Sequence, residues 1–293
     1  MSATVAGFSR RVGSLRAERR WALWSAYVSL IFAAVVMLTP PLYMLMTALK
    51  PSAEIADLGG NPWIVRSPTL ANFAEILGNP MFRGFFYNSM KVTVCVVILT
   101  MLISVPAAFA LSRMRFPGSQ FLATGVFLTY LVPDTLLFIP LYQIVGSLGL
   151  LNSTWGLVVI YPTLTVPFCT WIMIGYFASI PKELDEAALI DGAGWLQMLA
   201  RIFIPVALPG IIAATIFAFT VSWAAFVYPT AFITRPDEMP LTIGVVSQLI
   251  RGDTFAWGQL MAGALLAALP PVVVYAFLMD YYVAGLTAGA TKG

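Results

Sequence analysis

The sequence contains no histidine, and only 10% of its 293 residues are charged, whereas 60% are hydrophobic. Without imidazole, the chain cannot form the histidine-dependent triads, dyads or metal sites that many enzymes use. A soluble domain carries about 25% charged residues, so this composition excludes an ordinary soluble domain, a disordered chain and a nucleic-acid-binding module. The two cysteines, Cys95 and Cys169, lie inside apolar runs, which argues against a disulfide framework. The composition is that of a polytopic membrane protein.

Long stretches without Asp, Glu, Lys or Arg indicate membrane-spanning helices, because a helix needs about 20 apolar residues to cross the hydrocarbon core. Such stretches occur at 21–49, 92–112, 116–133, 135–181, 202–234 and 254–279. Gly, Asn and Ser residues interrupt the 135–181 stretch near 146–153, so we interpret it as the end of one helix followed by another. These runs predict an all-α transmembrane fold with six spans, centred near residues 33, 99, 131, 168, 217 and 269.

The distribution of Lys and Arg predicts the orientation, because basic residues favour cytoplasmic loops. With six spans, both termini share one side, and that side carries ten of the sixteen basic residues. We therefore expect cytoplasmic termini. The expected divisions are a cytoplasmic N-terminal segment at 1–20, a first transmembrane helix at 21–49, a periplasmic loop at 50–85, a five-helix core at 86–286 and a cytoplasmic C-terminal tail at 287–293.

Prolines lie in or beside most of the predicted spans. A single proline merely kinks a transmembrane helix. Together, the prolines favour broken helices around a pathway, as in transporters. They are Pro106, Pro133, Pro140, Pro162, Pro167, Pro229, Pro270 and Pro271.

The loop at 181–205 is predicted to fold as two short helices. Pro181 suits a first helical turn, and the acidic residues Glu183 and Asp185 follow at the positive end of the helix dipole. Gly192 suits the C-terminal end of this helix, where a positive φ is often needed. A second helix is indicated by an apolar stripe at helical spacing, formed by Trp195, Met198, Leu199 and Ile202.

This hairpin could rest on the membrane surface or dock onto another protein. Surface-lying helices favour Lys and Arg on their polar face. The loop begins with acidic residues instead, and its only basic residues are Lys182 and Arg201. The small side chains of Ala187 and Ala188 allow another backbone to approach closely. We therefore favour docking onto a protein.

The spacing within this loop resembles the EAA loop of ABC-importer permeases. In that family the pattern is Glu-Ala-Ala, three residues, Gly, nine residues, Ile, one residue, Leu and Pro. The matching residues here are Glu186, Ala187, Ala188, Gly192, Ile202, Ile204 and Pro205, with Ile204 in the place of the usual Leu.

Further stretches resemble the carbohydrate importers, on the side of the maltose-permease G subunit. They are Leu49-Lys50-Pro51, the segments 70–73, 113–118 and 148–153, and the ending 283–293. One departure touches the fifth span. Relatives often have Ser-Trp-Asn there, but Ser222 and Trp223 are followed by Ala224.

The resemblance implies a six-helix type I ABC-importer permease fold with a cytoplasmic coupling-helix loop, in the bacterial inner membrane. It implies a transport subunit rather than an enzyme. The implied partners are a second, paralogous permease, a dimer of ABC ATPase subunits, a periplasmic or lipid-anchored solute-binding protein and a sugar-like substrate. The chain has no Gly-Lys dipeptide and hence no Walker A loop, so ATP and Mg would be bound by the ATPase subunits. We expect no cofactor or metal in this chain and no nucleic-acid partner.

The resemblance also assigns residues that couple ATPase closure to alternating access. Glu186 would make the polar contact in the ATPase groove, and Gly192 would set the turn. The coupling set is Glu183, Asp185, Glu186, Ala187, Ala188, Asp191 and Gly192. The C-terminal residues Thr291, Lys292 and Gly293 would reach into the ATPase interface.

The substrate pathway is predicted from residue type, because aromatic faces and hydrogen-bonding side chains grip sugars. The candidates are Tyr130, Gln143, Trp171, Trp223 and Tyr228, although packing or interfacial anchoring explains each of them more simply. Asp134 joins them because carboxylates inside a membrane are usually functional.

Two other functions remain open from the residues alone. An ion-driven secondary transporter would use Asp134 as its coupling carboxylate, but it leaves the 186–205 pattern unexplained. A membrane-embedded enzyme would need a Ser–Lys dyad, and no Lys lies deep in a predicted span. The charge-free run 239–250 is too short to cross a membrane, so it is either re-entrant or packed on the bundle.

Overall fold

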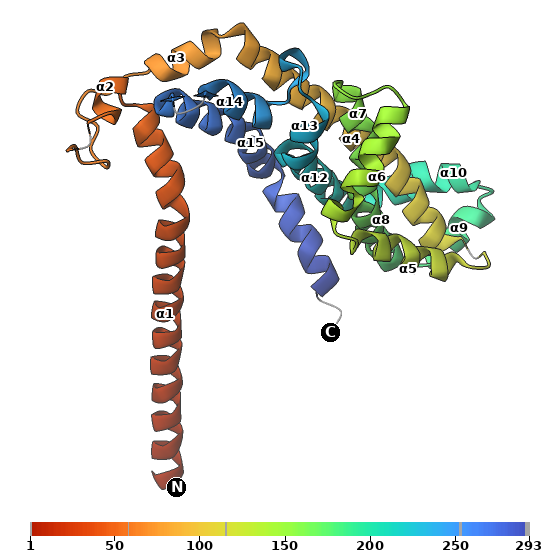
Figure 1. Cartoon of the computed structure of the whole chain (residues 1–293). Helices are drawn as coiled ribbons and strands as arrows, with labels where there is room; N and C mark the ends of the chain where they lie inside the picture. The colour runs from red at the N-terminus through yellow and green to blue at the C-terminus, as the bar shows by residue number, and fades with distance from the viewer. Residues whose placement is uncertain (1, 58, 115, 252–253, 291–293) are drawn as a thin grey trace. The chain divides into compact units, whose positions relative to one another are not determined.

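The computed structural model describes residues 2–57, 59–114, 116–251 and 254–290 (Figure 1). Within these ranges, side chains are described for residues 18–247, 249–250 and 256–279. Contacts divide the chain into two units, residues 1–73 with 257–265 and residues 74–256 with 266–293. The described residues are helical or connecting, apart from an antiparallel hairpin of β1 (Ile250–Arg251) and β2 (Thr254–Phe255). The predicted all-α fold class is thereby confirmed.

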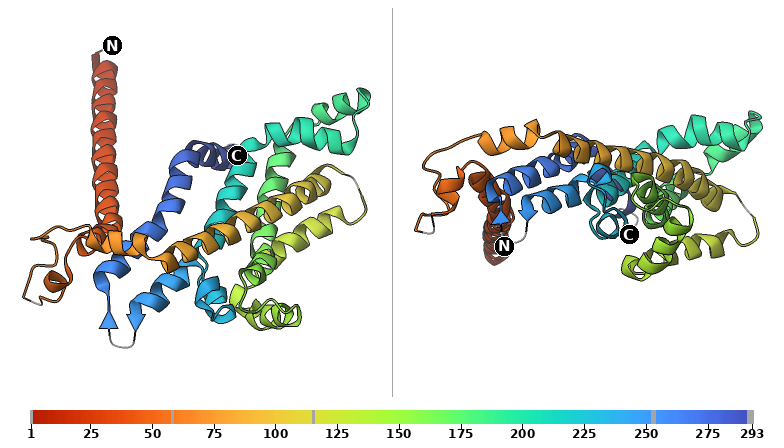
Figure 2. Two further views of the ribbon diagram at one scale, coloured as in Figure 1. Left: turned by 90° about the horizontal axis from the view of Figure 1, so that it is seen from above. Right: turned by 45° about the horizontal axis from the view of Figure 1, so that its top comes forward.

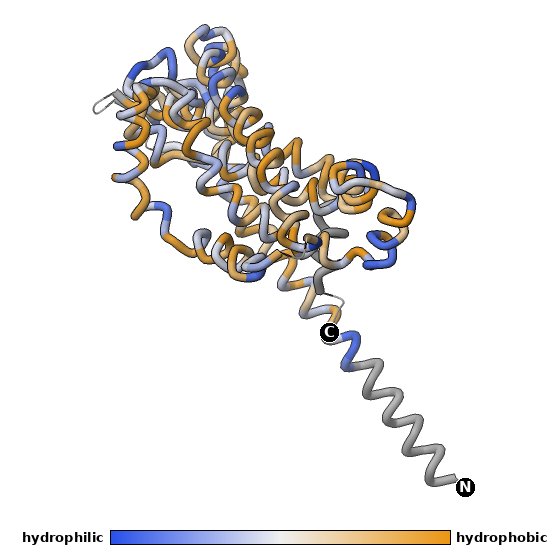
Figure 3. The backbone as a smooth tube through the Cα atoms, turned by 90° about the vertical axis from the view of Figure 1, so that its right-hand side faces the viewer, coloured by the Kyte–Doolittle hydropathy of each residue, from blue (hydrophilic) through white to orange (hydrophobic). Residues whose placement is uncertain are grey.

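Four described helical segments are long and apolar enough to cross a membrane: Glu18–Ala48, Pro80–Arg113, Thr154–Ser179 and Trp257–Met279. Two helix pairs also pass this test together, Ser119–Tyr130 with Asp134–Ser147, bent by 96°, and Trp195–Val206 with Leu208–Ala224, bent by 81°. Six spans result if each bent pair counts as one. Figure 3 shows hydrophobic residues along most helices, with hydrophilic residues gathered at turns and helix ends.

The first unit contains α1 (Ser2–Ala48), α2 (Ser52–Ile55) and a loop that its own hydrogen bonds hold together. The amide of Asn72 donates to the carbonyls of Ala48 and Lys50, at 2.8 and 2.9 Å. The buried Lys50 ammonium donates in turn to the Pro62 carbonyl at 2.8 Å. These bonds fold the chain after α1 back onto the end of that helix.

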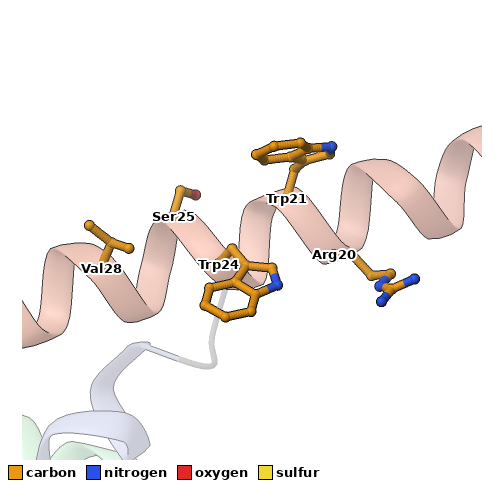
Figure 4. Close-up of a pocket in the computed structure, with 5 residues that line it drawn as sticks. All are labelled: Arg20, Trp21, Trp24, Ser25 and Val28. Atoms are coloured by element: carbon orange, nitrogen blue, oxygen red, sulfur yellow. The ribbon is translucent and has the colours of Figure 1, made fainter.

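The described side chains of α1, those of residues 18–48, are largely uncovered within the first unit. The most apolar stretch of Glu18–Ala48 has no buried residue. A surface hollow on this helix is lined by Arg20, Trp21, Trp24, Ser25 and Val28, and Figure 4 shows that all five side chains come from α1 itself. The hollow is therefore an open helix face rather than an enclosed site.

The second unit is built around α4 (Pro80–Arg113). This helix begins at Asn79, whose side chain accepts a hydrogen bond from the Met81 N–H at 2.9 Å. Two helices, α8 (Pro162–Ser179) and α12 (Leu208–Ala224), pack on α4, and α5 (Ser119–Tyr130) packs on α8. This unit also contains α6 (Asp134–Ser147), α7 (Thr154–Ile160), α13 (Val227–Phe232), the 3-10 turn η2 (Pro236–Glu238), α14 (Leu241–Leu249), the β1–β2 hairpin, the short helices of the 181–205 loop and most of α15 (Trp257–Ala290).

Hydroxyl groups join α4 to α8 inside this core. The Thr100 and Thr165 hydroxyls form a buried hydrogen bond of 2.6 Å, and Thr165 Oγ1 also lies 3.2 Å from the Tyr161 carbonyl of its own segment. One turn further along α4, the Ser104 hydroxyl donates to the Val166 carbonyl at 3.3 Å. Such bonds between membrane helices typically stabilise by about 0.6 kcal/mol each.

The third predicted span differs from a continuous helix. Its expected centre, near residue 131, falls where the chain turns between α5 and α6. Pro133 explains the break, because it lacks an N–H group and disfavours helical geometry in the preceding Val132. The prolines thus predicted a real break in this span. The charge-free runs, from which the span was predicted, did not indicate it.

The charge-free run at 239–250 packs on the bundle. It forms α14, which lies against α4 with Gly244 facing the Phe85 ring. The segment before α14 is also held, because the Glu238 carboxylate accepts from the Thr154 N–H and hydroxyl, both at 2.8 Å. The Ser89 hydroxyl accepts from the Leu241 N–H at 2.8 Å.

Some expected boundaries shift in the structure. The predicted loop 50–85 contains α2 and α3 (Ala71–Gly78), and α4 already begins at Pro80. The predicted tail begins inside α15, which continues to Ala290. Thr291, Lys292 and Gly293 lie outside the described residues.

Close packing of α8 and α12 makes Gly210→Ala destabilising. An added Cβ at Gly210 would lie 2.4 Å from Cγ of Tyr176, the base of the ring, so the two helices would have to separate. We expect the free energy of unfolding to fall by about 1–3 kcal/mol, measured as a lower melting temperature of the purified protein in detergent. Gly175→Ala in α8 is the control, since its Cβ would meet no atom within 4 Å. Equal melting temperatures of the two variants would contradict this packing.

The loop of the first unit should lose local order in acid. The backbone N–H of Arg66, at 2.8 Å, and then that of Ser67, at 3.1 Å, hold the pKa of the Glu54 carboxyl below its usual value. A lowered folded-state pKa stabilises the loop above the unfolded pKa of about 4.3, and this stabilisation disappears as pH falls through the folded pKa.

Amide hydrogen exchange at residues 66–67, corrected for its intrinsic pH dependence, measures this effect. Protection should be lost as the pH falls below about 4.3 and through the folded-state pKa, whereas Glu54→Gln should show weak protection throughout. Equal protection of the native chain and of Glu54→Gln at neutral pH would contradict the assignment.

Candidate functional site

The predicted hairpin at 181–205 consists of α9 (Glu183–Ile190) and α10 (Trp195–Met198), joined by a turn at residues 191–194. Gly192 has φ +77°, which confirms the expected left-handed conformation. The Ala193 N–H donates to the Ala188 carbonyl at 2.9 Å, which closes the end of α9. After α10, the chain continues as a π-helical turn, η1 (Leu199–Phe203), and α11 (Ile204–Val206) before bending into α12.

The predicted coupling residues lie on two different faces of the hairpin. Ala188 is buried and the Asp185 carboxylate is mostly buried, so both face the bundle. The other members are exposed: Glu183, Glu186, Ala187, Asp191 and Gly192. Large apolar side chains join them on the exposed surface, with Ile190 87% and Leu196 81% exposed.

Arg113, the last residue of α4, lies beneath the hairpin. Its side chain is only 3% exposed, and its guanidinium forms an ion pair of 3.1 Å with Asp185. The same group donates to the carbonyls of Phe177 and Ile180 at the end of α8. It also lies 4.8 Å from the centre of the Phe203 ring in η1.

An aromatic cluster supports this arginine. The Phe109 ring makes edge-to-face contacts with Phe177, Trp195 and Phe203, with ring centres 6.1, 6.2 and 4.9 Å apart. Figures 1 and 2 show α9 and α10 beside the C-terminal end of α4. The base of the hairpin is therefore a packed part of the second unit.

Sequence reasoning missed the role of Arg113. The segment 113–118 entered the sequence analysis only as a stretch that resembles the carbohydrate importers. The sequence did contain an indication of this role. Arg113 directly follows the charge-free run 92–112, at the end of the span that is predicted to lie on the same side of the membrane as Asp185. An arginine at that border needs a partner when it is buried.

Two of the predicted pathway residues, Tyr130 and Trp171, belong to one aromatic row on α5, α8 and α12. The Phe127 and Trp171 rings are 5.0 Å apart, Phe168 and Trp171 6.0 Å, and Tyr130 and Phe168 4.8 Å. Phe217 of α12 continues the row, 4.2 Å from Phe168. Tyr130 and Trp171 are 40% and 46% exposed, so the row has an open side. Phe127, Phe168 and Phe217 were not predicted, since phenylalanines in spans usually fill cores.

The other pathway candidates have structural roles or stand apart. Trp223 is buried and its Nε1 donates to the Ala267 carbonyl at 2.9 Å. The buried Tyr228 hydroxyl donates to the Asp134 backbone carbonyl at 2.7 Å. The exposed Asp134 carboxylate accepts the N–H of its neighbour Thr135, and Gln143 is exposed on α6. Among the described residues, His, Cys, Asp and Glu form no group that could hold a metal ion.

Comparison with known proteins gives a consistent family. Residues 101–287, more than half of the chain, match the family described as "Binding-protein-dependent transport system inner membrane component". The chain is 32% identical over 271 residues to the inner membrane ABC transporter permease protein YcjP of Escherichia coli, covering 91% of this chain and 95% of that protein. It is 30% identical to the trehalose/maltose transport system permease protein MalG of Thermococcus litoralis, with the same coverage of each chain.

A solved structure has the same fold. It is a chain of a bacterial ABC transporter involved in the import of the acidic polysaccharide alginate. The TM-score is 0.79 at 22% identity, and the alignment covers 91% of this chain and 98% of that chain. Together with the family match, this similarity leads to one assignment. The chain belongs to the family of binding-protein-dependent transport system inner membrane components and is a multi-pass membrane permease subunit of an ABC importer.

Proposed function

We propose that this permease subunit imports a sugar or a sugar-like solute and that its α9–α10 hairpin couples ATPase closure to alternating access. Relatives over about 90% of the chain are named for the transport of trehalose/maltose and of diacetylchitobiose. Another relative is named for sulfoquinovosyl glycerol. Because all three solutes are carbohydrates or glycosides, they support this substrate class.

Energy for transport comes from outside this chain. The family consists of transport subunits, and ATP hydrolysis lies in partner ATPase subunits. The ion-driven alternative is not retained, because the family works with a binding protein and the Asp134 carboxylate is exposed and accepts a hydrogen bond from the N–H of its neighbour Thr135. The enzyme alternative is not retained either, because the family consists of transport subunits.

The exposed face of α9 is the observation that carries the coupling proposal. Glu186 and Ala187 point away from the bundle while Asp185 and Ala188 hold the helix to it. Exposed Ile190 and Leu196 add apolar area to this face. Contact of apolar area with water is unfavourable, so such a face indicates an interaction surface. A helix with an anchored side and a free, partly apolar side suits insertion into a groove of another protein.

The proposed arrangement places this hairpin and both termini in the cytoplasm, as the positive-inside rule predicts. The loop at 50–85 and the segment 235–253 then face the periplasm and the solute-binding protein. The uncovered α1 face offers a packing surface to a second, paralogous permease. The tail residues Thr291, Lys292 and Gly293 remain proposed contacts of the ATPase subunits.

The substrate pathway is proposed to run along the open side of the aromatic row. Tyr130 and Trp171 are partly exposed there, and aromatic rings pack well on the apolar faces of sugar rings. Trp223 and Tyr228 are assigned to packing instead, because their polar atoms are already bonded inside the bundle. For Asp134 and Gln143, a role in the pathway is supported by their exposed positions alone.

Reversal of the Glu186 charge should release the ATPase subunits. In membranes, Glu186→Lys should insert normally but retain at least about tenfold less ATPase, because a disrupted interfacial charge costs about 2–5 kcal/mol. Gly192→Val should have a similar effect, since a branched side chain at φ +77° strains the turn.

Co-purification of the ATPase and ATP-driven uptake into vesicles containing the complete complex measure both effects. Glu18→Lys, an exposed charge reversal on α1, is the control and should behave like the unmodified chain. Normal uptake by both loop variants would refute coupling through α9. Uptake that survives ATP depletion but stops with a proton ionophore would refute the ATP-driven assignment.

Removal of one ring from the aromatic row should slow import without affecting assembly. We expect Trp171→Ala to lower the uptake rate roughly fivefold at subsaturating substrate, since one aromatic contact contributes about 1 kcal/mol. ATPase co-purification should stay unchanged. Trp155→Ala on α7 is the matched control, because Trp155 is comparably exposed, at 52%. Equal uptake by the two variants would remove the row from the pathway.

A further inference from the structure

We propose that Arg113 is a positioning residue for coupling, which together with Asp185 forms a buried clamp between the hairpin and the bundle. The inference rests on the proposed coupling role of α9 and adds the contact through which movement of α9 reaches α4 and α8. It concerns the inner face of the hairpin, whereas the ATPase contact concerns the outer face. The two roles can therefore be tested separately.

The guanidinium brings four segments together. It belongs to the last turn of α4, pairs with Asp185 of α9 at 3.1 Å and lies over Phe203 of η1 at 4.8 Å. Its remaining bonds go to the carbonyls of Phe177 and Ile180, at the end of α8. An arginine suits such a junction because its planar group presents several donors in fixed directions. A displacement of α9 thus acts directly on the ends of two spanning helices.

The bonds to α8 also satisfy that helix. The last carbonyls of a helix lack partners within it, and a cation is favoured at that end. Arg113 supplies both the donors and the charge. Loss of the guanidinium therefore removes the side-chain donor from the Ile180 carbonyl and the partner of the Asp185 carboxylate in a nearly closed site, whereas the Phe177 carbonyl keeps its bond from the Ile180 N–H.

The guanidinium divides its bonds between two helices. Arg113 Nη1 bonds to Asp185 of α9, and Nη2 bonds to the two carbonyls at the end of α8. Arg113 Nε and Asp185 Oδ1 are buried and have no hydrogen-bond partner, so a single bond holds the ion pair. A lysine at position 113 has one nitrogen and no planar fork, so it cannot keep this division between α9 and α8.

The test compares ATP hydrolysis with substrate import in vesicles that contain the complete complex. Asp185→Asn keeps the side-chain size but removes the charge, and Arg113→Lys keeps the charge but removes the fork. We expect both variants to retain the ATPase subunits and to hydrolyse ATP. ATP consumed per substrate imported should rise at least fivefold for Asp185→Asn and about twofold for Arg113→Lys. Lys182→Ala, an exposed charge removal beside α9, should leave this ratio unchanged.

Each outcome has a defined meaning. A raised ratio with the ATPase retained supports the clamp. A normal ratio for Asp185→Asn overturns it, even if Glu186→Lys releases the ATPase and so supports docking through the outer face. Loss of the ATPase from Asp185→Asn also overturns it, because Asp185 would then act at the interface itself. Arg113→Ala serves as a further variant, and if it fails to fold, the Asp185→Asn result decides.

Discussion

The absence of hydrogen-bond partners in the hydrocarbon core constrains every part of this chain, because each backbone N–H and carbonyl must be satisfied by the protein. Helices meet this demand within themselves. Beside the break between α5 and α6, the Tyr228 hydroxyl donates to the Asp134 carbonyl and ties α13 to the start of α6. At the end of α8, Arg113 donates to the carbonyls of Phe177 and Ile180. At both places a side chain from another helix reaches the backbone of a helix end.

Hydrophobic runs and turn chemistry predicted much of the fold. The spans, the short hairpin and the positive φ of Gly192 follow from local composition, because they depend on burial and on the geometry of single residues. The 96° turn around Pro133 does not follow, since proline permits a kink of any size and packing sets its angle. The position of α14 against α4 likewise depends on contacts between distant segments.

The candidate site was predictable in location but not in detail. Asp185 and Glu186 are adjacent acids in one motif, yet one faces Arg113 and the other faces outward. Successive helical residues differ by about 100° in direction, so the sequence fixes that they diverge but not which one the bundle covers. Only part of the aromatic row was predicted. Tyr130 and Trp171 were chosen because their residue types suit sugar binding, whereas the phenylalanines that contact them were not chosen.

The hydroxyl seam between α4 and α8 bears on how this protein can move. Thr165 lies within reach of both the Thr100 hydroxyl and the Tyr161 carbonyl of its own segment. A hydroxyl swivels about a single bond, so it can exchange one acceptor for the other as the helices slide. Relative sliding of α4 and α8 therefore leaves Thr165 with an acceptor on its own segment, so its bond to α4 can break without leaving the Thr165 hydroxyl unpaired.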